Sequence, residues 1–137
     1  MIFPNDPAVY VSPYRPAPKL AADAHAQAWQ WPKLNQINKA TIMMAAKSLF
    51  VLPAHFGDNW DALYDALTEQ SWCPYAPNLW TLPLYKANDI DWDEFAVFLD
   101  ICQDLCDFLA ANAILLYVHV LATDKQLTHL LDYPSWP

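Results

Sequence analysis

The sequence predicts a small α/β domain, in which a three-stranded parallel sheet packs with about four helices. Two observations support this class. Apolar residues make up 55% of the 137 residues and aromatic residues 15%, which is enough to bury a core and unlike a disordered chain. Segments with strand and helix periodicity follow in the order strand, helix, helix, strand, helix, strand, and helical connections between strands favour parallel pairing.

Residues 1–24 are expected to form a proline-rich extension ahead of a domain at 25–137. We expect this segment to lie extended over its own domain, with Phe3, Tyr10 and Tyr14 as apolar anchors. The alternative is that its two Pro-x-x-Pro spacings bind another protein. The prolines that exclude regular helix and central strand here are Pro4, Pro7, Pro13, Pro16 and Pro18.

The first half of the domain is predicted to contain one strand and two helices. The strand at 26–34 alternates loosely in polarity. A helix then runs from a cap at Asn35 or Asn38 to about residue 50, because Leu52-Pro53 cannot continue it. A second, shorter helix begins around residues 58–61 and ends near residue 70, ahead of a proline turn.

The second half alternates strand and helix again. Residues 78–86 read as a strand interrupted by Pro83, and 92–111 as the longest helix, with a wide apolar stripe opposite its aspartates. Residues 113–121 form a nearly continuous apolar run, as expected for a strand covered on both faces. A last short helix is expected from residue 123 or 124 to 131.

The charge pattern indicates which partners fit the chain. The net charge is −8, and the window from Asp58 to Asp107 holds eleven acids against one base, Lys86. Nucleic acid is a poor direct partner, because binding it requires basic groups that neutralise phosphates. A basic protein fits better, since opposite fields steer association. The alternative is that the acids keep an apolar-rich protein soluble.

The chain shows no sign of a membrane or secreted protein. Its richest apolar run, residues 110–122, is interrupted by Asn112 and His119 and is shorter than the ~20 residues of a spanning helix. The start lacks the basic and apolar regions of a secretory signal. We therefore expect a cytoplasmic location.

The cysteines are expected to be structural. Their number is odd, and Cys102 and Cys106 lie four apart on a predicted helix without enough neighbouring ligands for a metal site. They read as small core residues beside Cys73. We expect no metal and no cofactor.

The segment at residues 55–68 is the candidate functional site. It holds Gly57, the only glycine of the chain, followed by a helix with Asp61 and Asp65 four apart, so that both carboxylates project from one face. The flanking residues that complete this acidic, aromatic-rimmed surface are His55, Phe56, Asn59, Tyr64 and Thr68.

Three interpretations of the carboxylate pair compete. A hydrolase would need one carboxyl with a raised pKa in a pocket, and no phosphate-binding, nucleophile or zinc motif accompanies the pair. We therefore expect no enzyme activity. Helix capping explains Asp58 and Asp61 but not Asp65. In the third interpretation, the carboxylates pair with a basic site on a partner, each in place of a phosphate.

At these residues the chain resembles the barstar family of intracellular ribonuclease inhibitors. The shared pattern is a Leu-Pro, a loop glycine, an asparagine and then Asp-Ala-Leu…Asp…Leu-Thr. In this chain it is formed by Leu52, Pro53, Gly57, Asn59, Asp61, Ala62, Leu63, Asp65, Leu67 and Thr68. The resemblance implies the barstar-like fold and a loop and helix that insert into a ribonuclease active site.

The resemblance also implies roles for single residues. Asp65 matches the principal acidic contact of the family and Asp61 its neighbour, while Gly57, Asn59 and Thr68 match further contact positions. Tyr64 stands where barstar has a tryptophan. Asp107 is the nearest match to the family's acidic contact from a later helix.

The expected function is therefore that of an immunity protein, or antitoxin. It would be a monomer when free and would bind a basic ribonuclease or nuclease toxin as a 1:1 heterodimer. The alternative is a barstar-like module that binds a partner other than a nuclease.

Overall fold

The computed structural model describes residues 3–14, 26–52, 57–74 and 77–137, and it confirms the predicted α/β class. The elements are β1 (Val9–Pro13), β2 (Gln27–Gln30), β3 (Gln36–Ile37), α1 (Lys39–Phe50), α2 (Trp60–Thr68), β4 (Asn78–Pro83), the short 3₁₀ helix η1 (Leu84–Lys86), β5 (Asp89–Ile90), α3 (Trp92–Ala111), β6 (Leu116–Ala122) and α4 (Asp124–Leu127).

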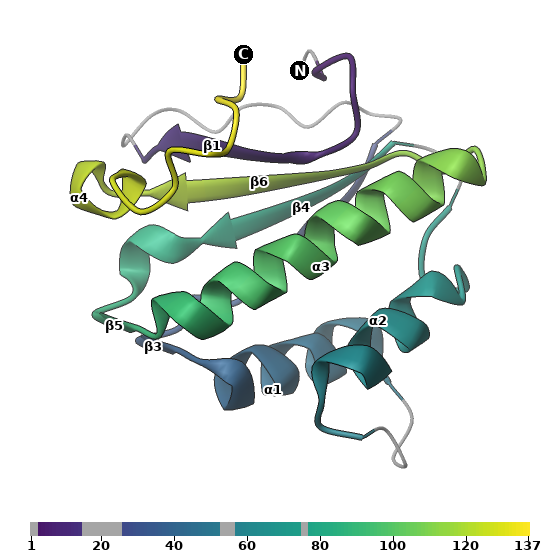
Figure 1. Ribbon diagram of the computed structural model, residues 1–137. Helices are drawn as coiled ribbons and strands as arrows, with labels where there is room; N and C mark the ends of the chain where they lie inside the picture. Colours follow the sequence, from purple (N-terminus) through teal and green to yellow (C-terminus); the bar gives the residue numbers. More distant parts are fainter. Residues whose placement is uncertain (1–2, 15–25, 53–56, 75–76) are drawn as a thin grey trace.

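The main sheet is parallel throughout, with strand order β1-β6-β4-β2. The helices α1, α2 and α3 lie on one side of it, and the C-terminal tail lies on the other (Figure 1). A second, two-stranded sheet pairs β3 with β5 in parallel. None of the helices in the described part of the chain is long and apolar enough to cross a membrane.

The main sheet has four strands, one more than the three expected, because residues 9–13 form β1. This strand lies within the segment expected as an extension, and it pairs with β6 in parallel from Val9↔Val118 to Pro13↔Ala122. On its other side Val11 bonds to the C-terminal tail, donating to Pro134 O over 2.9 Å. Prolines before and at the end of the strand leave its middle free to pair, so they exclude a long strand and not a short one.

Helix ends are set by local chemistry. The side chain of Asn38 accepts from the backbone N–H of Thr41 and caps α1, as one of the two predicted asparagines. Val51 lies in the left-handed region at φ 51° and caps the C-terminus of α1, which ends at Phe50 as expected. Thr123 caps α4, which is shorter than the helix expected to reach residue 131.

The main core lies between the sheet and the helices. Trp80 of β4 and the inner residues of β6 are fully buried there, in one cluster with Phe98 of α3. Trp31 is buried in this core, and Trp29 packs against it. Burial of these large side chains is the main source of stability for a domain of this size.

The second face of the sheet is covered by the two ends of the chain. Tyr10, Leu79 and Tyr117 are buried there under Phe3 and Trp136. The rings of Phe3 and Tyr117 lie 4.8 Å apart, and those of Tyr10 and Trp136 lie 5.6 Å apart. Phe3 and Tyr10 therefore anchor the N-terminal residues to the domain, as expected.

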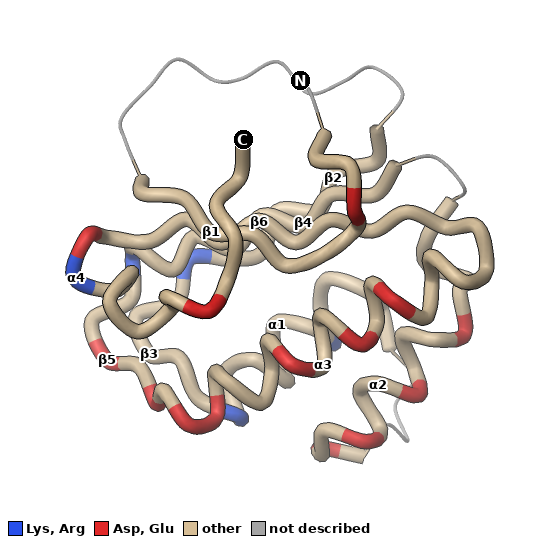
Figure 2. Tube along the Cα trace, turned by 45° about the horizontal axis from the view of Figure 1, so that its top comes forward, with Lys and Arg blue, Asp and Glu red and all other residues tan. Residues whose placement is uncertain are grey.

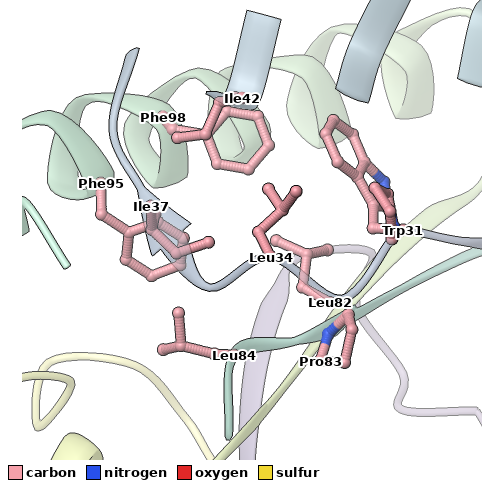
Figure 3. A pocket seen from close by; sticks show the side chains of 10 residues that line it. Trp31, Leu34, Ile37, Ile42, Leu82, Pro83, Leu84, Phe95 and Phe98 are labelled. Carbon is pink, nitrogen blue, oxygen red and sulfur yellow. The ribbon is translucent and has the colours of Figure 1, made fainter. Parts of the chain in front are cut away.

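A small apolar cavity of about 30 Å³ lies within the main core (Figure 3). Its lining includes Leu34, Ile37 and Leu82, with Phe95 and Phe98 from α3. The volume is comparable to that of a single water molecule, far below that of a ligand pocket. The cavity is therefore a packing gap and not a candidate site.

Candidate functional site

The start of α2 is fixed by Asn59. Its side chain accepts from the backbone N–H of Ala62 over 2.8 Å, and its own backbone N–H donates to Gly57 O over 2.8 Å. This N-cap places Asp61 in the first turn, where a carboxylate suits the positive end of the helix. Asn59, one of the predicted contact residues, thus also serves as the cap.

An acidic groove of about 420 Å³ runs between α2 and α3. Asp61, Tyr64 and Asp65 line it from α2, and Asp104 lines it from α3. Figure 2 shows acidic residues along both helices. Three of the predicted contact residues are therefore brought together on one surface. The complete lining is Trp60, Asp61, Tyr64, Asp65, Ile101 and Asp104.

The groove carries a strong negative field. Partial burial raises the pKa of the Tyr64 phenol above its ordinary value, and the charges of Asp104, Asp65 and Asp107 raise it further, in that order. Tyr64 is therefore a neutral hydrogen-bond donor beside several carboxylates. Such a surface attracts a cation that carries its own hydrogen-bond donors, such as a guanidinium or ammonium group.

Asp104 lines the groove but is not among the residues predicted from the sequence. The resemblance pointed to Asp107 instead, which lies outside the groove lining and accepts from Nε2 of Gln103 over 3.1 Å. Both aspartates lie on the outer side of α3, so their positions along the helix gave no reason to prefer one of them as the contact residue. Only the placement of α3 against α2 separates them.

Trp60 was also missed. It forms one wall of the groove, and its Nε1 donates to Oε2 of Glu94 over 2.9 Å. A tryptophan at the first position of a short acidic helix was the available signal, because a large aromatic group beside fixed charges is a frequent interface feature.

The remaining predicted residues are not part of the groove lining, and two of them fall outside the described residues. Gly57 is exposed and does not adopt a positive φ. Thr68 donates its hydroxyl to Asp65 O over 2.9 Å, within the helix. Asp58, next to Gly57, forms an ion pair with Lys47 of α1. His55 and Phe56 fall in the stretch that the structure does not describe.

The cysteines are buried, as expected. Cys102 and Cys106 lie on the inner face of α3 and Cys73 is buried near the end of α2. Burial raises the pKa of the Cys106 thiol far above its ordinary value, so it stays protonated and unreactive. Within the described ranges no three His, Cys, Asp or Glu side chains are grouped so as to hold a metal ion.

Comparison with known proteins identifies the family. Residues 35–120, more than half of the chain, match the family model described as Barstar (barnase inhibitor). No curated protein and no solved structure matches at a significant level. The matched range contains α1, α2 and α3, the groove between α2 and α3, strand β4 and most of β6. The chain therefore belongs to the barstar family of barnase inhibitors.

Proposed function

We propose that this protein is an immunity protein that binds a basic ribonuclease toxin and blocks its active site. The contact surface is the loop and helix at residues 55–68, completed by Asp104. The observation that carries the proposal is the acidic groove, where Asp61, Asp65 and Asp104 face one space and no Lys or Arg is part of its lining. A ribonuclease active site is cationic because it binds phosphates, and carboxylates at matching positions can replace them.

Inhibition of this kind requires no chemistry. The carboxylates pair with the cations that the nuclease uses to bind RNA, while Tyr64 and Trp60 supply apolar contact area beside them. The partner's field and the net charge of −8 favour rapid encounter in a 1:1 complex. The protein would act in the cytoplasm of the cell that makes the toxin, where free nuclease is harmful.

The test is inhibition and binding of two probes, barnase and the small basic ribonuclease encoded nearest to this chain's gene. Asp65→Ala should weaken binding by about 2–5 kcal/mol, because a cation of the partner is left buried and unpaired. Asp132→Ala removes one exposed carboxylate far along the chain from the groove and serves as the matched control. Its affinity should stay close to that of the wild type.

Two results would contradict the proposal. One is that neither ribonuclease is inhibited. The other is that Asp65→Ala and Asp132→Ala bind equally well. The association rate should also fall as salt is raised, since screening at 0.1 M already acts over about 10 Å.

A further inference from the structure

The α2 surface by itself is small for a specific interface. The helix has nine residues, of which Asp61, Tyr64 and Asp65 line the groove. A stable protein complex usually buries about 800 Å² on each side and involves about 20–30 residues there. A ribonuclease bound at α2 must therefore also touch a neighbouring helix, and α1 and α3 are the two available flanks (Figure 1).

The α1 flank has the wrong charge for a basic partner. A groove of about 480 Å³ lies there, lined by Lys39, Lys47 and Asp58 together with methionines. Met44 is 71% exposed, so apolar area is available. Two lysines against one aspartate, however, give this groove a positive balance that repels a cationic surface.

The α3 flank has the matching charge. The helix contains five acids and no base. Val97 and Phe108 are 39% and 36% exposed on it, so apolar area is available beside the acids. Val97, Ile101, Asp104 and Phe108 follow spacings of four, three and four, which place them in one row along about 17 Å of helix. We call these four residues the α3 row.

The α3 row is continuous with the acidic groove. Ile101 and Asp104 belong to both, because they line the groove opposite Asp61 and Asp65. A partner that reaches Asp65 across the groove therefore meets Ile101 next, and then Val97 and Phe108 on either side. Apolar side chains flanked by carboxylates fit a surface in which an apolar group is flanked by Lys or Arg.

We propose that the α3 row is the second contact surface of the same complex and that the ribonuclease packs an apolar side chain, flanked by cations, against Val97, Ile101 and Phe108. This inference rests on the proposed function. Contact at the α3 row would add a hydrophobic contribution to the binding free energy, which salt does not weaken, in a complex whose encounter is electrostatic. The carboxylates would govern the association rate, and the α3 row would govern the dissociation rate.

The experiment uses the full chain and whichever of the two ribonucleases it inhibits. The double variant Val97→Ala/Phe108→Ala should raise Kd at least tenfold, mainly through faster dissociation. The salt dependence of Kd should change little. Met44→Ala is the matched control, because it shortens an even more exposed apolar side chain on the opposite flank. It should change Kd less than twofold.

Amide exchange of the free and bound wild-type chain gives a second readout that needs no substitution. Contact between the ribonuclease and the exposed side of α3 should slow amide exchange over residues 97–108 in the complex. If the double variant does not fold, this footprint decides the question alone, and absence of protection there would overturn the proposal.

The outcomes separate the two proposals. If Asp65→Ala weakens binding while the double variant binds like wild type, the α3 row is wrong and the inhibitor function stands. If Met44→Ala is the variant that weakens binding, the partner lies on the α1 flank and the α3 row is again wrong. If Asp65→Ala has no effect, the proposed function fails and the α3 row falls with it.

Discussion

The indole Nε1 of Trp60 donates a hydrogen bond to Oε2 of Glu94 over 2.9 Å, which joins the first turn of α2 to the first turn of α3. Both side chains are partly buried. Since Trp60 also forms a wall of the acidic groove, this bond helps to set the distance between the carboxylates of α2 and Asp104. The groove is therefore held at one end by a contact that involves none of its own carboxylates.

Removal of this bond should lower stability. Glu94→Ala should reduce the free energy of unfolding by about 1–2 kcal/mol, because the indole N–H loses a charged acceptor. Glu94→Gln keeps an acceptor oxygen and should lose less. Asp93→Ala, which removes the neighbouring first-turn acid without touching Trp60, controls for the helix dipole. Urea unfolding measures all three, and equal losses for Glu94→Ala and Asp93→Ala would show that the bond contributes nothing.

The field inside the groove can be tested without a partner. Asp104 is the charge that raises the pKa of Tyr64 most, after the effect of burial. Asp104→Asn should therefore lower the pKa of Tyr64 more than Asp65→Asn or Asp107→Asn does. NMR titration of the tyrosine ring carbons measures this shift. If Asp107→Asn produces the largest change, the later helix contributes its charge from that position, as the sequence resemblance suggested.

Much of the fold could be predicted because periodicity is a local property. The order of the main strands and helices followed from alternation and from helical spacing. The observed caps, Asn38 and Thr123, are each one of two candidates that residue type allowed. The strand β1 was missed because prolines were read as excluding pairing. The two-residue strands β3 and β5 were missed because each is held by a partner more than fifty residues away.

The residues that line the groove could be predicted from the sequence only where they share one helix. Asp61, Tyr64 and Asp65 share one short helix, so their proximity follows from spacing alone. Asp104 comes from another helix, and its choice over Asp107 depends on how α3 rotates and packs against α2. That rotation is a property of the whole core, which no local pattern encodes.

Gly57 is the only glycine of the chain, and the structure shows whether its backbone needs one. It has no positive φ, and an added Cβ would lie 3.1 Å from Nδ2 of Asn59 and 3.7 Å from Cβ of Ala62. The backbone therefore does not require glycine for the turn. Gly57→Ala should cost less than about 1 kcal/mol of stability, since only the end of the Asn59 side chain must shift.

The effect of this position on binding should be larger. If the loop backbone approaches a ribonuclease closely, Gly57→Val should reduce affinity by more than it reduces the free energy of unfolding. Calorimetry of the complex and urea unfolding of the free chain give the two values. A variant that loses stability and keeps its affinity would show that the glycine serves the fold alone.

His119 gives the protein a specific sensitivity to acid. Its Nε2 lies 2.8 Å from Oγ of Ser12, and its ring stacks on Trp136 at 4.5 Å, so the C-terminal tail covers it. Burial lowers the pKa of His119 from 6.5 to about 4. The unfolded chain therefore binds a proton at this residue between those two values while the folded chain does not. The contribution of the neutral His119 ring to the free energy of unfolding is complete above pH 6.5. It is lost as the pH falls towards 4, by at most about 3 kcal/mol.

Comparison of two unfolding series isolates this contribution from the carboxylates that titrate nearby. Wild type and His119→Gln should show a stability difference that shrinks or reverses between pH 7 and pH 4, because the variant has no imidazole to protonate. Direct NMR titration of the His119 ring should give a pKa well below 6.5. Parallel curves for the two proteins, or a ring that titrates near 6.5, would mean that the tail does not shield His119, and the packing of Trp136 on the second face of the sheet would then be looser than the structure indicates.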